Sequence, residues 1–523
     1  MLECQSNSCE EVKRLEAELS SLKSAFQRVE EMNRLLQAQL FGRKSEKRVS
    51  APETSQLLLF PSPEVELPPP VDHTEEITYE RKKPGRKKLP KDLPRIDIMY
   101  DIPEEDKVCE CGCQKTRIGE ETSEKIDYIP ATLQILNIIR PKYACKGCEG
   151  VESSSPAVMI APPPKSLVSK SNASVGLLAH VFTAKFADAL PFYRLEKIFA
   201  RQGIHISRSS MSNWAIKAAE KCTPLIAAMH DLMLEGPLIQ CDETPLQVLK
   251  EPGREDTKKS YMWLFRGGPP DKPALIYCYH PTRAGKVAKD FLRQYKGYVQ
   301  TDGYAGYDFL DGRKGVYHMA CWAHARRKFF EASKAAKAAS NDNSSSSYAD
   351  VAIQKIALLY KVEKYIKKCQ MDHEQGLQYR QENAKPVLDD LKKWLLDISA
   401  LTPPKGLLGK AVHYTLKQWP RLCIYAQTSH VPPDNNLAEN AIRPFVVGRK
   451  NWLFSGSPSG AKASAIFFSL IETAKANNIE PFAYLKYIFT VLPHVKTKSE
   501  YRKLLPSFAD PGRIASCKDR VVQ

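Results

Sequence analysis

The stretch Leu238-Ile-Gln-Cys-Asp-Glu-Thr-Pro-Leu-Gln-Val-Leu249 is an apolar, strand-like run with the carboxylate of Asp242 near its middle. A charged group inside a packed sheet loses its hydration, so it is normally excluded unless it is paired or binds a metal ion. Asp242 is therefore a candidate site residue. The alternative interpretation is a strand on an open sheet face, with Asp242 pointing toward water.

A sheet is predicted around this stretch. Two further apolar runs follow it through turns rich in Gly and Pro, as in antiparallel neighbours, and a helix then leads to a parallel strand. This is the strand order of a ribonuclease H-like α/β core, in which the first and fourth strands lie side by side. The predicted elements are strands at Leu238–Leu249, Tyr261–Arg266, Ala274–His280, Tyr298–Asp302 and Gly315–Ala320, and helices over residues 284–295 and 321–330.

The predicted strand order brings a second carboxylate, that of Asp302, next to Asp242. Two carboxylates at close range repel each other unless a cation lies between them, and hard oxygen ligands favour Mg²⁺ or Mn²⁺. A helical insertion is predicted over about residues 335–430, and Glu439 follows it on a further helix. Glu439 would be the third ligand of a metal site.

Two other acidic residues compete with Glu439 for this role. Asp434 stands before the helix, where a carboxylate often serves only as a cap, and Glu472 lies in a later helix. Glu439 is preferred because its helix neighbours can position the carboxylate and contact phosphate. These neighbours are Asn440 and Arg443, on the same helix face as Glu439, and Asn435 or Asn436 can cap that helix.

The composition favours a polyanionic partner. The chain of 523 residues carries 77 Lys and Arg against 60 Asp and Glu, a formal net charge of +17, so nucleic acid is preferred over a merely soluble basic surface. No run approaches the ~20 uninterrupted apolar residues of a membrane span, and no signal pattern opens the chain. Most of the 14 cysteines are scattered singly, which fits a reducing, intracellular compartment.

The N-terminal segment carries a heptad seam. From Val12 to Leu40 apolar residues recur at steps of three and four, and the surrounding positions are almost all polar. The pattern predicts that residues 1–45 self-associate as a coiled coil, with Asn33 selecting register and a dimeric state. The alternative is a single helix docked on its own protein.

Residues 46–98 are predicted to be a basic, Pro-rich linker. The run Arg81-Lys-Lys-Pro-Gly-Arg-Lys-Lys-Leu-Pro-Lys91 gathers basic side chains around a Pro-Gly turn. Arginine inserted into an A·T-rich minor groove gains from its negative potential, so Arg86 and Lys87 are candidate DNA contacts. The alternative is a solubilising linker.

A cysteine cluster predicts a zinc-binding module. Cys145 and Cys148 have the two-residue gap of a zinc knuckle, and a second pair would complete a tetrahedral thiolate site. Cys109 and Cys111 are the first choice for that pair, with Cys113 as the alternative. Chance clustering of structural thiols is the competing interpretation.

Within residues 165–228, the segment from Val175 to Cys222 is predicted to form short amphipathic helices, with Ser207 as the N-cap of the last one. They resemble a helix-turn-helix whose second helix offers polar side chains to DNA. An ordinary helical hairpin is the alternative. Met211, Trp214 and Ala215 are expected to face inward, and Arg208, Ser209, Ser212 and Asn213 to face DNA.

Basic side chains near the predicted acidic site are candidate phosphate contacts, with a solvated basic face as the alternative. Cys321 and His324 could also bind a metal ion, but a packed thiol and a hydrogen-bonded histidine are preferred. The candidate phosphate contacts are Arg326, Arg327, Lys328, Arg443, Arg449 and Lys450.

Several motifs run through nearly the whole chain in order. They are Leu40-Phe-Gly-Arg-Lys-Ser-Glu-Lys, Tyr143-Ala-Cys-Lys-Gly-Cys148, Phe199-Ala-Arg-Gln-Gly203, Asp242-Glu-Thr-Pro245, Thr301-Asp-Gly-Tyr-Ala-Gly-Tyr307, Cys321-Trp-Ala-His-Ala-Arg-Arg-Lys-Phe329, Gly448–Gly456 and Ile471-Glu-Thr-Ala-Lys475. With these motifs the chain resembles the transposases of the IS66 insertion-sequence family. Any one motif is weak, but so many in this order are specific.

The resemblance implies a DDE transposase that cleaves and transfers DNA strands. Its triad would be Asp242, Asp302 and Glu439 with Mg²⁺ or Mn²⁺, and Zn²⁺ would occupy the cysteine module. The expected partners are DNA at the element ends and the target, further copies of the chain, and small companion proteins encoded by the same element. The expected location is the bacterial cytoplasm, at the nucleoid.

The implied organisation is multidomain, and two other functions compete with transposition. The first is a zinc-containing dimeric DNA-binding regulator without catalysis, and the second is a ribonuclease H-like nuclease without strand transfer. The expected domains are a coiled coil at 1–45, a linker at 46–98, a zinc module at 99–155, a helix-turn-helix-like region at 165–228, a catalytic domain at 229–475 and a C-terminal extension at 476–523.

Overall fold

A computed structural model describes residues 133–144, 158–338 and 347–519, and positions 14–16, 18–23, 25–26, 29–30 and 33. The chain divides into two compact units, residues 1–49 with 136–523 and residues 50–135. All the strands and helices named below belong to the first unit. The predictions on Arg86, Lys87, Cys109, Cys111, Cys113, Cys145 and Cys148 fall outside the described residues.

The described positions between residues 14 and 33 are helical, as the heptad pattern predicts. The apolar side chains of Leu15, Leu19, Leu22 and Phe26 are all more than half exposed. A partner helix that covered this seam would remove apolar surface from water, and each buried Å² would stabilise the pair by about 25 cal/mol of free energy. The seam therefore supports self-association, which stays a prediction.

Deleting residues 1–45 is expected to give a smaller assembly, because the exposed seam is removed. Light scattering at one protein concentration compares the full and truncated chains. Within the full chain, Leu19→Asp should reduce the mass, whereas Glu18→Gln, on a neighbouring polar position, should leave it unchanged. Equal masses for the full and truncated chains would contradict the coiled-coil prediction.

A short hairpin and three helices precede the main sheet. Strands β1 (Lys142–Ala144) and β2 (Val158–Ile160) pair antiparallel. They are followed by α3 (Val175–Phe186), α4 (Phe192–Arg201) and α5 (Arg208–Leu234).

Helix α5 begins as the sequence predicts. The Ser207 hydroxyl accepts the N–H of Ser210 at 3.1 Å, so Ser207 is the N-cap. The predicted boundary between residues 228 and 229 lies inside α5, and the choice between a helix-turn-helix and a helical hairpin stays open. Met211, Trp214 and Ala215 are buried and Arg208, Ser209 and Asn213 are exposed, as predicted, while Ser212 is half-buried.

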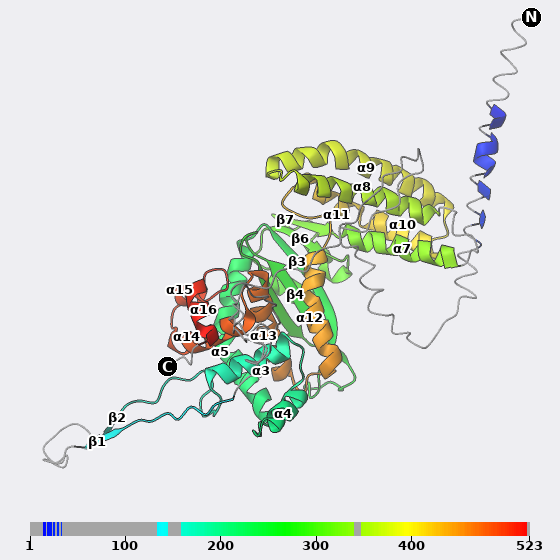
Figure 1. The fold of residues 1–523 in the computed structure, drawn as a ribbon. Coiled ribbons are helices and arrows are strands. Elements are labelled where there is room, and N and C mark those ends of the chain that lie inside the picture. The colour runs from blue at the N-terminus through cyan, green and yellow to red at the C-terminus, as the bar shows by residue number, and fades with distance from the viewer. Residues whose placement is uncertain are drawn as a thin grey trace, which may run out of the picture. The chain divides into compact units, whose positions relative to one another are not determined.

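A five-stranded mixed sheet forms the centre of the fold (Figure 1). Its order is β5-β4-β3-β6-β7; β3, β4 and β5 are antiparallel neighbours, and β6 runs parallel to both β3 and β7. The predicted neighbourhood of the first and fourth strands is confirmed. The elements are β3 (Leu238–Gln247), β4 (Lys259–Gly267), β5 (Ala274–His280), α6 (Lys286–Phe291), β6 (Gly297–Thr301), η2 (Ala305–Leu310) and β7 (Val316–Ala320).

The sheet is buried on both faces. On one face Phe265 of β4 stacks on Phe291 of α6, with ring centroids 3.7 Å apart. On the other face Tyr277 of β5 packs against Phe445 and Phe468, from two later helices. Because aromatic side chains bury the largest apolar areas, these contacts make the sheet the core that positions its strand ends.

A helical insertion follows β7, as predicted. Its helices enclose an apolar cluster that includes Trp322, Ala352, Leu391 and Leu422. In Figure 1 these helices gather beyond the β6 and β7 side of the sheet. They are α7 (Trp322–Ala338), α8 (Tyr348–Lys368), α9 (His373–Leu401), α10 (Leu407–Lys417), α11 (Trp419–Cys423) and η3 (Ile424–Gln427).

Two helices then return to the sheet. Helix α12 (Asn436–Trp452) packs on β3 and β4, and α13 (Pro458–Ala476) runs along β5. The backbone N–H groups of Leu275 and Tyr277 donate to Thr473 Oγ1 (2.9 Å) and Ser469 Oγ (2.8 Å). These hydroxyls satisfy the edge of β5, which would otherwise present unpaired backbone groups.

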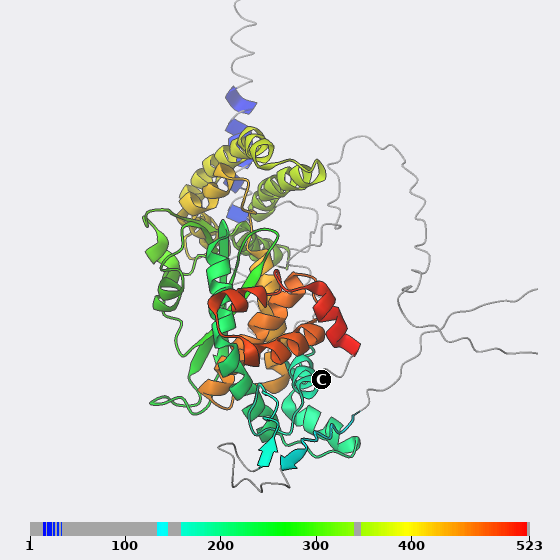
Figure 2. The ribbon, with the colours of Figure 1, turned by 90° about the vertical axis from the view of Figure 1, so that its left-hand side faces the viewer.

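The C-terminal helices α14 (Pro481–Val491), α15 (Lys498–Lys503) and α16 (Pro511–Asp519) complete the described fold. Figure 2, turned toward this side, shows them beside the long α5 and α13. Among the helices described, none has the length and apolar character needed to cross a membrane.

Candidate active site

Two of the predicted acids come from adjacent parallel strands. Gln240 of β3 lies opposite Gln300 of β6, and their amides bond at 2.8 Å. Asp242 and Asp302 each follow two residues later, so the register carries both to the same end of the strand pair. The Asp302 carboxylate accepts the N–H of Tyr304 at 2.9 Å, which fixes the turn after β6.

The charges of the other two predicted acids act on Asp242. Burial, followed by the charges of Glu243, Glu439 and Asp302, raises the pKa of Asp242 well above its usual range. A carboxylate that is both buried and surrounded by like charge is stabilised by a bound cation. The charges of Asp302 and Glu439 therefore both reach Asp242, and the role of the three acids as one metal site stays a prediction.

The start of α12 is fastened to the strands that carry the aspartates. Gln240 and Gln300 donate their side-chain amides to the carbonyls of Asp434 (3.2 Å) and Pro432 (3.1 Å). Asn435 is the N-cap residue but its side chain makes no capping bond; it donates instead to the Cys241 carbonyl at 3.0 Å. Asn435 is thus the cap residue, as predicted, but its side chain holds α12 on β3 instead of bonding to the first turn.

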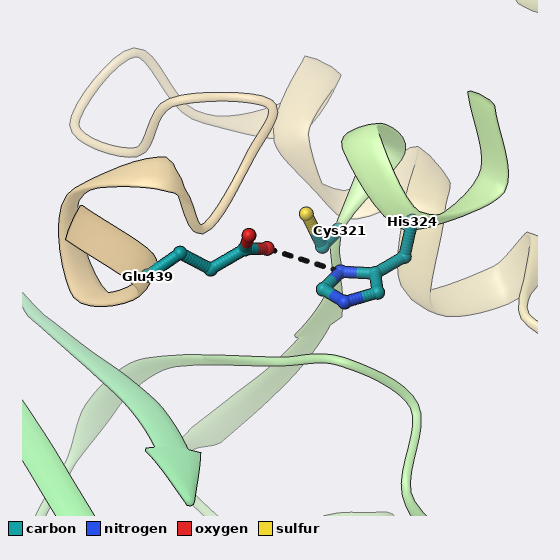
Figure 3. Close-up of side chains that lie close together, drawn as sticks. All are labelled: Cys321, His324 and Glu439. Atoms are coloured by element: carbon teal, nitrogen blue, oxygen red, sulfur yellow. Dashed lines mark ion pairs between the residues drawn. The ribbon is translucent and has the colours of Figure 1, made fainter. Parts of the chain in front are cut away.

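Glu439 lies in the first turn of α12 and contacts α7. Arg327 donates to its Oε2 at 3.2 Å, and His324 Nδ1 lies 3.5 Å from its Oε1 (Figure 3). Burial raises the pKa of Glu439, and burial followed by the charge of Arg327 lowers the pKa of His324 to about 4. Within the described part of the chain, neither Oε1 nor Nδ1 has a hydrogen-bond partner.

The competing acids have other partners. Asp434 accepts the backbone N–H of Asn436 at 3.2 Å and the hydroxyl of Tyr360, which ties it to the helix start. Glu472 is buried on α13 and pairs with Lys475 at 2.9 Å. Of the three candidates, Glu439 is the one with a buried oxygen, Oε1, that has no hydrogen-bond partner among the described residues.

A group that the sequence did not predict supports Asp302. Glu243, with a side chain only 2% exposed, accepts hydrogen bonds from Arg283 Nε (2.7 Å) and from the Tyr307 hydroxyl (2.7 Å). Arg283 also lies 3.9 Å from Asp302 and stacks on the Tyr304 ring. Glu243 and the tyrosines stand within quoted motifs, but Arg283 lies in a turn without a distinguishing pattern.

The predicted basic residues occupy different positions. Arg327 contacts Glu439, and Arg449 donates to Thr244 Oγ1 at 3.0 Å, so both are also part of the framework of the site. Lys328 stacks over the ring of Tyr414, whose hydroxyl donates to the Asp302 carbonyl at 2.7 Å. Exposed or half-buried side chains are those of Arg208, Asn213, Arg326, Arg443 and Lys450.

Comparison with known proteins gives the family. Residues 170–463, which include all three acids, match the family model described as "Transposase IS66 family". The chain belongs to this family. Three further IS66-type models match residues 28–98 ("Transposase C of IS166 homeodomain"), 106–149 ("zinc-finger binding domain of transposase IS66") and 469–507 ("IS66 C-terminal element").

Similar proteins occur in Sinorhizobium fredii. The uncharacterized protein y4jD is 32% identical over 434 residues, which cover 80% of this chain and 81% of y4jD. The uncharacterized protein y4qI is 28% identical over 520 residues, which cover 96% of this chain and 93% of y4qI. The IS66 resemblance is thus confirmed, and a transposase of this family with a zinc-finger domain has DNA as its partner and Zn²⁺ as a supported cofactor.

One zinc ion per chain is expected in the segment that matches the zinc-finger model. Thiolates select Zn²⁺ over Mg²⁺, so Cys145→Ser should remove most of the metal, measured by mass spectrometry of reduced, freshly purified protein. Cys369→Ser changes an exposed cysteine outside that segment and serves as the matched control. Zinc content unchanged by Cys145→Ser would contradict the assignment.

Proposed function

We propose that this IS66-family protein binds the ends of its insertion element and catalyses DNA strand cleavage and strand transfer. Asp242, Asp302 and Glu439 would form its DDE triad on a ribonuclease H-like core. The observation that supports the proposal is that Asp242 and Asp302 follow the paired β3 and β6 at equivalent positions, with the charges of Asp302 and Glu439 both acting on Asp242.

The residues fit a divalent cation. Asp242 has its pKa raised by burial and by its acidic neighbours, and Glu439 Oε1 is buried without a hydrogen-bond partner in the described part of the chain. Carboxylate oxygens are the ligands that Mg²⁺ and Mn²⁺ prefer. Such ions, when bound, would supply the charge that activates a water or a 3′-hydroxyl and stabilises the leaving oxygen of a phosphodiester.

The surrounding side chains would hold the acidic residues in place and contact DNA. Arg283 and Tyr307 donate hydrogen bonds to the two oxygens of Glu243, so this carboxylate already has partners within the protein. Arg327 holds Glu439 Oε2, so Oε1 stays turned toward α7. Along α12, Arg443 and Lys450 are exposed and would contact DNA phosphates, as would Arg208 and Asn213 at the start of α5.

The N-terminal modules would increase the affinity for DNA and join copies of the chain. The zinc-finger match, the basic run with Arg86 and Lys87, and the exposed heptad seam support a self-associating protein with several DNA contacts. Zinc would be held by Cys145 and Cys148 with Cys109 and Cys111, or with Cys113 replacing one of that pair.

The test uses the purified full chain, target DNA and DNA that carries the element's own ends. Cleavage followed by joined products is expected with Mg²⁺ or Mn²⁺, and neither with a chelator. Cleavage without joining would favour a ribonuclease H-like nuclease, and metal-independent binding without cleavage would favour a DNA-binding regulator. Each of these two outcomes would overturn the transposase proposal.

A further inference from the structure

Two buried ligand atoms face each other at the α7 end of the site. Figure 3 shows the Glu439 carboxylate and the His324 imidazole pointing toward one another, with the Cys321 sulfur beside them. Oε1 and Nδ1 are 3.5 Å apart, and both lack a hydrogen-bond partner among the residues described. A buried polar atom without a partner is costly, so two of them aimed at one space indicate a missing group.

The sulfur of Cys321 has a different role. It lies within 4.8 Å of the other two ligand atoms, but it accepts the backbone N–H of Asn435 at 3.2 Å and that of His324. Cys321 directly precedes α7, so its sulfur caps this helix and joins it to the start of α12. This leaves one nitrogen and one oxygen as the free ligand pair.

The separation of these two atoms suits a shared ion. Metal–ligand bonds of about 2.0–2.2 Å to nitrogen and oxygen place neighbouring ligand atoms about 3 to 3.5 Å apart. Arg327 occupies Oε2 at 3.2 Å, which fixes the carboxylate with Oε1 toward the imidazole. A site made only of carboxylate oxygens suits Mg²⁺. A site that adds an imidazole nitrogen favours divalent ions of the first transition row over Mg²⁺.

We propose that His324 supplies an imidazole ligand to the divalent ion held by Glu439, so that this end of the site binds Mn²⁺ more tightly than Mg²⁺. The inference rests on the proposed function only in taking Glu439 as a metal ligand. It assigns His324 a role separate from the DDE acids, because the nitrogen selects the ion and the carboxylates supply the charge.

The test measures metal binding by the full chain without DNA. In wild-type protein loaded with Mn²⁺, pulsed electron paramagnetic resonance is expected to detect a ¹⁴N coupling that becomes a ¹⁵N coupling when histidine is ¹⁵N-labelled. His324→Gln should abolish this coupling and weaken Mn²⁺ binding by about tenfold or more, with Mg²⁺ affinity changed less than about threefold. The matched control is His413→Gln, an exposed histidine on α10.

His324→Asp provides a second variant with an oxygen ligand at the same position. It should bind Mg²⁺ at least as tightly as wild type, without the nitrogen coupling. Absence of the coupling in wild type, its persistence in both variants, or equal losses of Mn²⁺ and Mg²⁺ affinity in His324→Gln would overturn the proposal. A failed transposase proposal is recognised separately, by wild-type protein that binds or cuts DNA without joining it although its Mn²⁺ complex shows the nitrogen coupling.

Discussion

Replacing Glu439 by Gln is expected to lower the rate of DNA cleavage by on the order of a thousandfold or more, with DNA binding retained. Gln keeps the shape of the side chain and can still accept from Arg327, but it lacks the negative charge that a divalent ion requires. Single-turnover cleavage and binding anisotropy are measured on the same DNA, so that a loss of catalysis is separated from a loss of binding.

Asp434→Asn and Glu472→Gln are the matched controls for this variant. Each amide retains an oxygen that can accept the hydrogen bonds now made to Asp434 by Asn436, or to Glu472 by Lys475. Cleavage by both controls is therefore expected to stay within a few-fold of wild type. If Glu439→Gln cut normally and one of these controls did not, the third acid of the triad would be that residue instead.

The parts of the fold that could be predicted from the sequence are those encoded locally. An apolar run interrupted by Asp242 identified β3, and the turns and helix that follow it identified the strand order. Once β3 and β6 were neighbours, the placement of Asp242 and Asp302 toward the same end of the strand pair followed from their register. The start of α5 was likewise local, since Ser207 caps its own first turn.

The unpredicted contacts join residues far apart in the chain. Arg283 reaches Glu243 across 40 positions, and the Asn435 side chain reaches the Cys241 carbonyl across 194. No periodic pattern in the sequence encodes such a contact. Asn435 is of a residue type that favours helix caps, yet its side chain joins α12 to β3. His324 was expected to be hydrogen-bonded, yet its Nδ1 has no hydrogen-bond partner within the described residues.

The largest stability effect is expected from Arg380→Met on α9. Arg380 is 3% exposed and binds both oxygens of Glu363 on α8, at 2.8 and 2.6 Å. It also donates to the carbonyls of Tyr425 and Val431 at 3.0 Å each, and to that of Thr428. Methionine would leave one carboxylate and three carbonyls without this donor, at a cost of about 3–5 kcal/mol.

The control for this variant is Lys355→Met, which breaks an ion pair with Asp390 that joins the same two helices. Because the Asp390 side chain is 63% exposed, this loss should cost no more than about 1 kcal/mol. Hydrogen exchange over residues 424–435 should rise by about a hundredfold or more in Arg380→Met and much less in the control. Because this segment leads directly into α12, Arg380→Met should also slow DNA cleavage. If hydrogen exchange in the segment stayed unchanged, α12 would be held by its contacts with β3 alone.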